Sequence, residues 1–247
     1  MTEIVIQGIG GRMGHVLCDM IAQREDCRVI AGIDLKDGEQ NGIPVYDSLE
    51  KLDGKGDVII DFSAPAAVEK ALTYCEAHKM PIVVCTTGLS EELQLKVVQL
   101  SRIVPVFKSA NMSIGINLLS ELCKRASAIL GADYDVEIVE QHHHNKLDAP
   151  SGTAIITAQK IAEVRKAMHQ GNPDEKETMA GARGADYEGM KIHSVRLPGY
   201  VASQEVIFGG QGETLKISTD PINRECYMPG VALGCRKIVD QVGLVYG

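Results

Sequence analysis

The stretch TEIVIQGIGGRMG, residues 2–14, decides the fold of this chain. A β-rich run (3–8) leads into a glycine-rich turn, and an amphipathic helical pattern over residues 12–24 follows. This order of strand, glycine turn and helix is the context that a dinucleotide-binding fingerprint requires. The spacing is G-x-x-G-x-x-G rather than G-x-G-x-x-G, so the motif alone is a weak signal. A structural glycine turn without a ligand is the competing interpretation.

Each glycine of this turn has a physical reason to be there. Gly8 permits a sharp exit from the strand, and Gly14 lets the helix pack closely on the sheet. Gly10 and Gly11 allow backbone amides to approach a pyrophosphate. The unpaired N–H groups of the first helical turn would then face the phosphates, and Arg12 adds a positive charge at the same end.

An acidic residue follows the second expected strand, RVIAGID (28–34). A carboxylate at Asp34 suits the two hydroxyls of an adenosine ribose and would repel a 2′-phosphate. Lys36, two residues further on, could offset that repulsion. The sequence therefore favours NADH without excluding NADPH.

The rest of the first hundred residues continues the alternation of apolar strands and helices. Strands are predicted at 57–63, 81–88 and 104–109, with helices at 65–78 and 90–102. Apolar strands separated by helices indicate a parallel sheet covered on both faces. Ligands bind at the carboxyl ends of such strands, so CTTG (85–88) and KSANMS (108–113) are candidates to line a nicotinamide, although each is weak as an isolated motif.

After residue 111 the pattern changes. A helix (115–130), a strand (134–143) and a helix beginning near Ser151 precede a polar loop (169–189), and the last predicted strands are 190–197, 203–209 and 213–219. Tight turns between these strands predict a mixed or antiparallel second sheet. The fold class is therefore α/β, a Rossmann-type doubly wound parallel sheet plus a smaller α+β domain. We expect a dinucleotide-binding domain at 1–112, a second, substrate-binding domain at 113–220, and a C-terminal helix at 221–247 that returns to the first domain.

The composition excludes several classes of partner. The 247 residues carry a formal charge of −8 and 45% hydrophobic residues, which argues against a general nucleic-acid or acidic-membrane binder because both need a basic face. We see no signal peptide and no apolar run of the roughly 20 residues that a membrane helix needs. Seven cysteines without a Cys-x-x-Cys pair are typical of reduced thiols. We expect a cytoplasmic protein.

The stretch EQHHHNKLDAPSGTA (140–154) concentrates three histidines and a lysine before a Pro-Ser-Gly-Thr turn. If the strand continues in extended form, His142 and His144 share one face and His143 lies on the other. Three consecutive histidines therefore cannot all bind one metal ion, and no second His or Cys cluster completes a set of ligands. We expect no metal. A solvated polar loop without a task and an acid/base site remain open.

The surroundings of the cluster favour the acid/base site. Histidine titrates near neutrality, and Lys146 offers a second proton or a fixed positive charge. Gly152 and Thr153 fall in the first turn of the following helix, where backbone N–H groups face an anion. Together these residues form a credible cradle for a carboxylate beside a proton donor.

The motifs taken together resemble one family. GIGGRMG, DFSAP, TTG, SANMSIGIN and EQHHHNKLDAPSGTA, followed by VRLPG and QEVIFGGQGETL, are similar in order and content to the 4-hydroxy-tetrahydrodipicolinate reductases. The resemblance implies reduction of 4-hydroxy-tetrahydrodipicolinate to tetrahydrodipicolinate by NADH or NADPH, with loss of water, in diaminopimelate and lysine synthesis. It also implies a small acidic heterocyclic substrate and a homotetramer assembled through the sheets of the second domain.

The resemblance further implies roles for individual residues. The pyrophosphate-binding residues would be Gly8, Ile9, Gly10, Gly11, Arg12 and Met13, and the ribose would contact Asp34. The residues bordering the nicotinamide would be Cys85, Thr86, Thr87, Ser109, Ala110, Asn111 and Met112. His142 would donate the proton, with Lys146 as its partner or as the acid itself. The substrate carboxylates would be held by His143, Lys146, Gly152 and Thr153.

The chain departs from the family pattern at a few positions. Relatives usually have glycine at the position of Cys85, often Arg-His at 144–145, and in many cases histidine at the positions of Ser203 and Thr219; Arg224 is retained. The absent histidines bear on the electrostatics of the second domain and leave the central motif intact. The alternatives are another nicotinamide-dependent dehydrogenase, of the homoserine or aspartate dehydrogenase type, and a non-catalytic dinucleotide sensor. Neither has a reason to carry the block HHHNKLDAPSGTA.

Overall fold

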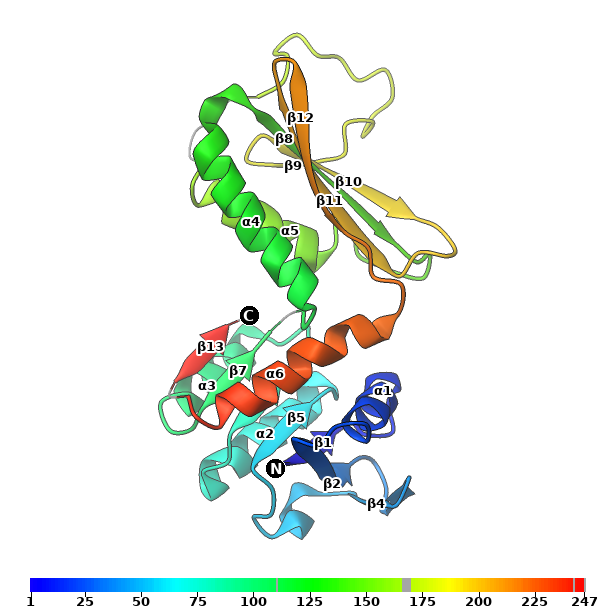
Figure 1. The fold of residues 1–247 in the computed structure, drawn as a ribbon, viewed down its shortest axis with the longest axis vertical. Helices are drawn as coiled ribbons and strands as arrows, with labels where there is room; N and C mark the ends of the chain where they lie inside the picture. Colours follow the sequence, from blue (N-terminus) through cyan, green and yellow to red (C-terminus); the bar gives the residue numbers. More distant parts are fainter. Residues whose placement is uncertain (110, 166–169, 242, 247) are drawn as a thin grey trace. The chain divides into compact units, whose positions relative to one another are not determined.

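A computed structural model describes residues 1–109, 111–165, 170–241 and 243–246. The chain divides into two compact units. Unit 1 comprises residues 1–113 together with the chain from Tyr227 onward, and unit 2 comprises Ile114–Cys226. The chain thus leaves unit 1 once and returns to it once, and each unit has its own sheet (Figure 1).

Unit 1 is built on an eight-stranded sheet in the order β13-β7-β6-β5-β1-β2-β4-β3. Neighbouring strands pair in parallel, apart from the antiparallel edge pair β3–β4. The strands are β1 Thr2–Gln7, β2 Cys27–Ile33, β3 Gly38–Gln40, β4 Ile43–Tyr46, β5 Val58–Asp61, β6 Ile82–Val84, β7 Val106–Lys108 and β13 Leu244–Tyr246. The sheet has the predicted doubly wound α/β architecture.

Helices cover both faces of this sheet. One face packs against α1 (Arg12–Ile21) and α6 (Met228–Ile238), through residues such as Leu17 and Val231. The other face packs against α2 (Pro65–His78) and α3 (Glu91–Leu100), and the 3-10 turn η1 (Leu49–Leu52) joins that core. The C-terminal helix α6 is thus an integral part of unit 1.

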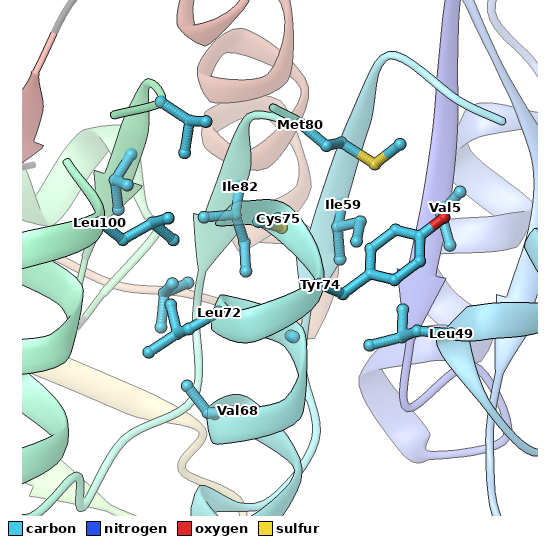
Figure 2. Close-up of a cluster of buried hydrophobic side chains, with 14 of the residues drawn as sticks. Val5, Leu49, Ile59, Val68, Leu72, Tyr74, Cys75, Met80, Ile82 and Leu100 are labelled. Atoms are coloured by element: carbon cyan, nitrogen blue, oxygen red, sulfur yellow. The ribbon is translucent and has the colours of Figure 1, made fainter. Parts of the chain in front are cut away.

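The two cores explain why the central strands are continuously apolar. Ile4 and Ile6 of β1 point into the α1/α6 core, and Val5 between them points into the α2/α3 core. Figure 2 shows the α2/α3 core, to which α2 contributes Val68 and Leu72 and β6 contributes Ile82. Successive strand residues face opposite sides, so a strand buried on both faces needs an apolar residue at every position.

Unit 2 has a five-stranded mixed sheet in the order β12-β11-β8-β10-β9. Strands β8 and β10 pair in parallel and the other pairs are antiparallel. One face packs against α4 (Ile114–Leu130) and α5 (Gly152–Ala162), and its core includes Phe208. The strands are β8 Asp135–His142, β9 Ala185–Tyr187, β10 Met190–Arg196, β11 Ala202–Gly210 and β12 Glu213–Thr219; the 3-10 turns are η2 Gly131–Asp133 and η3 Arg224–Tyr227.

Three details differ from the sequence-based expectation. Strand β9 lies inside the predicted loop 169–189, and the short strands β3, β4 and β13 were not predicted. More importantly, β8 ends at His142, and the Lys146 N–H donates to the carbonyl of His143 (3.1 Å), which makes a turn. The face assignment of His143 and His144 by strand alternation is therefore wrong, because the backbone leaves the extended conformation before them. None of the helices that the structure describes is long and apolar enough to cross a membrane.

Candidate active site

The sheet of unit 1 aligns five loops along one edge. Gln7 pairs with Ile33 on one side and Asp61 on the other, Asp61 pairs with Val84, and Val84 pairs with Lys108. Because these strands are parallel, the residues after this row leave the sheet at the same edge. The row thus brings the glycine turn, Asp34, the 62–64 segment, Cys85–Thr87 and Ser109 together.

The glycine turn is required by close backbone approaches. Gly8 has φ +81°, and a Cβ there would lie 2.7 Å from the carbonyl oxygen of Phe62. A Cβ on Gly14 would lie 2.3 Å from the carbonyl oxygen of Ile9. Helix α1 begins at Arg12 with Gly11 as its N-cap residue, which has no side chain to accept from the first-turn amides. These amides are suited to an anion such as a pyrophosphate.

The carboxylate of Asp34 lies directly against this turn. It accepts hydrogen bonds from the N–H of Gly10 (2.7 Å) and from the N–H of Leu35 (2.7 Å). A Cβ on Gly10 would lie 2.8 Å from the Asp34 carboxylate, so a side chain here would displace that carboxylate. Arg12 is exposed at the start of α1, whereas the side chain of Ile9 is fully buried in the core. The turn, α1 and Asp34 fit a dinucleotide, with Ile9 available through its backbone.

A buried carboxyl group that the sequence analysis did not select, Asp61, organises the centre of the edge. It is fully buried and accepts hydrogen bonds from the Gln7 amide (3.2 Å), the Thr86 hydroxyl (2.5 Å) and the Ser63 hydroxyl. All three donors are neutral. Burial raises the pKa of Asp61, and these hydrogen bonds only partly oppose the shift. The signal in the sequence is a lone acidic residue at the end of an apolar strand, VIID (58–61).

The candidates for contact with a nicotinamide differ in what they can offer. The Thr86 hydroxyl already donates to Asp61, and Thr87 is exposed. The Cys85 side chain is buried in the core, and burial raises the pKa of its thiol well above the ordinary value, so the thiol stays protonated.

Ser109, Asn111 and Ser113 are joined to one another by hydrogen bonds. The Ser109 hydroxyl donates to the carbonyl of Asn111 (2.6 Å), and the side-chain oxygen of Asn111 accepts from the N–H of Ser113 (2.9 Å). Met112 belongs to the α1/α6 core, as does the half-buried Met13. Ala110 lies outside the described residues.

Unit 2 holds the proton-donor candidates at the end of β8. His142 is the last residue of the strand, and its Nδ1 lies 2.5 Å from Glu140 Oε2. Two nitrogens of Arg196 donate to the two oxygens of the same carboxylate at 2.7 and 2.8 Å. Burial alone would raise the pKa of Glu140, but hydrogen bonds from His142 and Arg196 outweigh it and lower the pKa to about 2. Glu140 is thus a buried, ionised carboxylate behind His142.

The loop after His142 gathers positive charge. Lys146 pairs with Asp148 (2.8 Å), which lowers the pKa of the Asp148 carboxyl. The pKa of His143 is lowered, first by burial and then by the positive charges of Arg224, His142 and Lys146. Arg224 therefore lies close enough to His143 to act on its charge. Positive charge is therefore concentrated around this loop, although the chain as a whole has a net charge of −8. Such a concentration suits an anionic ligand.

The start of α5 borders the same loop. Ser151 caps the helix by accepting from the N–H of Ala154 (3.2 Å), and its own N–H donates to Glu140 Oε1 (3.2 Å). Gly152 is exposed, and a Cβ there would meet no described heavy atom within 4 Å outside its neighbours and its own helix backbone. Thr153 follows it in a half-buried position. Nothing in the described fold requires glycine at 152. The space beside its Cα is open, which suits a ligand at the start of α5.

The described residues contain no group of three His, Cys, Asp or Glu side chains that could hold a metal ion. The two clusters supply different chemistry. The edge of unit 1 offers glycine amides, a helix N-terminus and a carboxylate for a nucleotide. The end of β8 in unit 2 offers a protonatable histidine, a lysine and helix amides for an anionic substrate.

Both parts of the chain match models of one family. Residues 2–112 match the model described as dihydrodipicolinate reductase, N-terminus, and residues 115–247 match the model described as dihydrodipicolinate reductase, C-terminus. The chain belongs to the dihydrodipicolinate reductase family. This family assignment confirms the resemblance seen in the motifs.

Full-length relatives agree with the family. The chain is 44% identical over 261 residues to the 4-hydroxy-tetrahydrodipicolinate reductase of Shouchella clausii, covering 100% of this chain and 98% of the relative. It is 43% identical to that of Enterococcus faecalis, with the same coverage. The solved structure of dipicolinate-bound dihydrodipicolinate reductase from Paenisporosarcina sp. TG-14 is similar, with a TM-score of 0.90 and 37% identity, covering 100% of this chain and 98% of that one.

Membership in the dihydrodipicolinate reductases makes this chain an oxidoreductase with a nicotinamide cofactor. It also excludes the homoserine or aspartate dehydrogenase type and the non-catalytic sensor as its primary assignment. The residues at the edge of unit 1 fit that cofactor, because no side chain caps the first amides of α1 and the Asp34 carboxylate lies beside the glycine turn, 2.7 Å from the N–H of Gly10.

Proposed function

We propose that this chain reduces 4-hydroxy-tetrahydrodipicolinate to tetrahydrodipicolinate with NADH or NADPH, in diaminopimelate and lysine synthesis. One observation carries the proposal beyond family membership. In unit 2 a histidine held by a buried carboxylate stands at the end of a strand, followed by Lys146 and by the open amide end of α5 at Gly152. This set suits a ring that bears carboxylates and must be protonated.

The substrate carboxylates would be held by His143, Lys146, Gly152 and Thr153. Lys146 is paired with the exposed Asp148, and exposed ion pairs are weak, worth about 0–1 kcal/mol. A substrate carboxylate can therefore take the place of Asp148 at low cost. The helix N–H groups at 152 and 153 add charge-assisted hydrogen bonds, which are roughly twice as strong as neutral ones.

The chemistry requires one proton donor close to the ring. When bound, the reduced nicotinamide supplies the hydride, which we expect at the ring carbon C4 of a dehydrated, conjugated imine. Negative charge then develops towards C3 and the ring nitrogen. His142 quenches this charge with a proton, and Lys146 is the alternative donor. General acid catalysis of this kind contributes roughly 10²–10⁴-fold.

Asp34 supports NADH as the better cofactor. Its carboxylate lies against the glycine turn, where it would bind ribose hydroxyls and repel a 2′-phosphate. We expect kcat/KM to be higher with NADH than with NADPH. Replacing Asp34 by Asn should narrow the difference, and a preference that does not change would assign the selectivity to other residues such as Lys36.

The experiment that tests the proposed function follows loss of reduced nicotinamide with freshly generated substrate. We expect turnover by the unchanged chain and a fall in kcat of roughly 10²–10⁴-fold for His142→Ala, with a modest change in KM. His193→Ala is a matched control, because His193 of β10 also pairs with a glutamate, Glu137 (2.8 Å), on another part of the sheet. No turnover in the unchanged chain, or equal small losses in the two variants, would contradict the proposal.

We also propose a homotetramer assembled through the sheet of unit 2. Its support is the sheet face opposite α4 and α5, which carries the partly exposed apolar residues Val139, Val195 and Ile207 among charged ones. Light scattering after size-exclusion chromatography should give four times the chain mass of 26.7 kDa, and Ile207→Glu should lower it. A monomer at all concentrations would rule the tetramer out.

A further inference from the structure

Glu140 connects three separate segments of unit 2. Its side chain is fully buried, and its Oε2 lies 2.5 Å from the Nδ1 of His142. Oε2 also accepts from one Arg196 nitrogen (2.8 Å), while Oε1 accepts from the other (2.7 Å) and from the N–H of Ser151 (3.2 Å). Arg196 in turn donates to the carbonyl of Asp148 (2.8 Å), in the loop that carries Lys146.

This arrangement determines which nitrogen of His142 is available. An ionised carboxylate is an acceptor only, so Nδ1 must carry a hydrogen towards Glu140. The other nitrogen, Nε2, is then the one that can exchange a proton with a ligand. The bidentate pairing with Arg196 fixes the carboxylate in one orientation, because the guanidinium fork matches the two oxygens.

We propose that Glu140, supported by Arg196, is the positioning residue for His142: it holds the ring with Nδ1–H inward and presents Nε2 to the substrate. The inference rests on the proposed function, since it gives His142 its orientation in that reaction. The same carboxylate also ties the ring to the first residue before α5 and, through Arg196, to the Lys146 loop. Acid, lysine and helix amides are thereby kept in a fixed mutual arrangement.

The proton transfers balance without any other group changing its charge. Before the step His142 is an imidazolium with hydrogens on both nitrogens. The Nε2–H bond breaks, its proton goes to the substrate, and the electron pair stays on Nε2. The neutral ring keeps its hydrogen on Nδ1, and Glu140 remains ionised throughout. The charged groups around the pair are Arg196 from β10, Lys146 and Asp148 from the loop, and Arg224 from η3, and the titratable group beside them is His143.

Unit 2 offers a matched control for a merely structural role. Three residues before Glu140, Glu137 pairs with Arg183 (2.5 Å) and with Nε2 of His193 (2.8 Å). Both clusters therefore combine one glutamate of β8 with one arginine and one histidine. Glu137 is 32% exposed and Glu140 is fully buried. Glu137→Gln changes a similar set of contacts away from the candidate site, and because Glu137 lies on the sheet face proposed for the tetramer, the control is used only if its mass in solution matches that of the unchanged chain.

The deciding measurement is the protonation site of the neutral ring, and it needs no substrate. In the full chain labelled with ¹⁵N-histidine, the signal of His142 is assigned by its loss in His142→Gln. We expect the Nδ1–H form in the unchanged chain. In Glu140→Gln the amide oxygen can keep Arg196 and Ser151, so its NH₂ faces Nδ1 and the hydrogen should move to Nε2. An unchanged form in Glu140→Gln overturns the inference.

Turnover distinguishes this inference from the proposed function. We expect kcat to fall on the order of 10²-fold or more in Glu140→Gln, with KM changed by less than about threefold, and no change in Glu137→Gln. If the hydrogen moves to Nε2 but kcat is unchanged in both Glu140→Gln and His142→Ala, the proposed role of His142 is overturned. If His142→Ala is inactive and Glu140→Gln is fully active, the positioning role is overturned.

A second variant keeps the test decisive if Glu140→Gln does not fold. Removing the carboxylate alone leaves Arg196 without its counter-charge, which is costly in a buried site. Glu140→Leu combined with Arg196→Leu removes both charges together and leaves no acceptor for Nδ1 at position 140. In this double variant the Nδ1–H form should also be lost and kcat should fall, whereas a retained Nδ1–H form would overturn the inference.

Discussion

Each unit of this protein buries one carboxyl group beside its candidate site, and the two are held in opposite ways. Glu140 in unit 2 faces Arg196 and His142, which lower its pKa to about 2 despite its burial. Asp61 in unit 1 is equally buried, but its donors are the neutral groups of Gln7, Ser63 and Thr86, and its pKa is raised. Burial alone does not set the charge of a carboxyl group; the charge of its donors does.

The difference matches the task of each site. In unit 2 a permanent negative charge supports a histidine that must carry a proton. In unit 1 the loops at the sheet edge have to receive an anionic pyrophosphate, and a buried carboxyl group held by neutral donors orders them without adding a fixed cation–anion pair. Experiments on stability, on pH dependence and on single glycines test this comparison between Glu140 and Asp61.

The largest effect is expected from removing the cation in unit 2. Arg196→Met leaves the buried Glu140 without its bidentate cation and with only His142 and the Ser151 N–H as partners. This change should lower the free energy of unfolding by about 3–5 kcal/mol, measured by urea titration. Arg183→Met is the control. Its partner Glu137 is partly exposed, so this substitution should lower the free energy of unfolding by only about 0–1 kcal/mol. Equal losses of stability in the two variants would mean that burial does not make the Glu140–Arg196 pair more important for stability than the partly exposed Glu137–Arg183 pair.

The pH dependence should separate the two carboxyl groups by sign. The folded-state pKa of Glu140 lies below the ordinary value of 4.5, so its contribution is present above that pH. It is lost as the pH falls towards 2, and it amounts to on the order of 3 kcal/mol. Asp61 has a raised pKa, so its protonation on acidification favours the folded state and opposes this loss.

Urea unfolding between about pH 6 and pH 3 tests both signs. Glu140→Gln should flatten the loss of stability towards acid pH, and Asp61→Asn should make it steeper. Three identical slopes, for the unchanged chain and the two variants, would show that neither carboxyl group governs the acid response.

A smaller effect is expected when the charge at Asp61 is removed at neutral pH. Asp61→Asn keeps an acceptor for Gln7 or Thr86, so the free energy of unfolding should change by about 1 kcal/mol. Asp61→Leu leaves the same donors without an acceptor and should cost about 1–3 kcal/mol. If Asp61→Asn were as damaging as Arg196→Met, the ionised form of Asp61 would be essential and the comparison would fail.

The smallest effect on stability is expected at Gly152. An alanine there meets open space and is a better helix former by about 0.5–1 kcal/mol, so the thermal midpoint should stay or rise slightly. The KM for the substrate should rise about tenfold, equivalent to about 1.4 kcal/mol, because the methyl group occupies the carboxylate cradle. Gly8→Ala is the contrast in unit 1: its positive φ and the close Phe62 carbonyl make it destabilising. An unchanged KM in Gly152→Ala would remove Gly152 from the substrate site.

Much of the fold could be predicted because it depends on local patterns. The parallel sheet follows from apolar runs such as VIID (58–61), and α2 begins and ends where the sequence predicts, at Pro65 and His78. The short strands β3, β4 and β13 were missed because three or four residues carry too little periodicity. The end of β8 at His142 depends on the hydrogen bond between Lys146 and His143, which extended alternation could not anticipate.

The candidate site was predictable where a motif has a local meaning. The glycine turn, Asp34 and the histidine–lysine stretch can be recognised in the sequence alone. Asp61, Glu140 and Arg196 cannot be recognised in this way, because their roles depend on distant partners: Thr86 is 25 residues from Asp61, and Arg196 is 56 residues from Glu140. A signal existed for Glu140: it precedes His142 by two residues on one strand, so both side chains point to the same face.

The row of paired residues Ile33, Gln7, Asp61, Val84 and Lys108 has a consequence for engineering. Each loop of the nucleotide edge is attached to its own strand, so the 34–37 segment can be exchanged to retarget cofactor choice while the strands keep their register, at the cost of the hydrogen bond between Asp34 and Gly10. The length of a strand, unlike the sequence of a loop, cannot be changed without altering the core. Deleting one residue within Val58–Asp61 would turn the rest of β5 over, exchange its contributions to the two cores, and carry the carboxyl group of Asp61 away from Thr86.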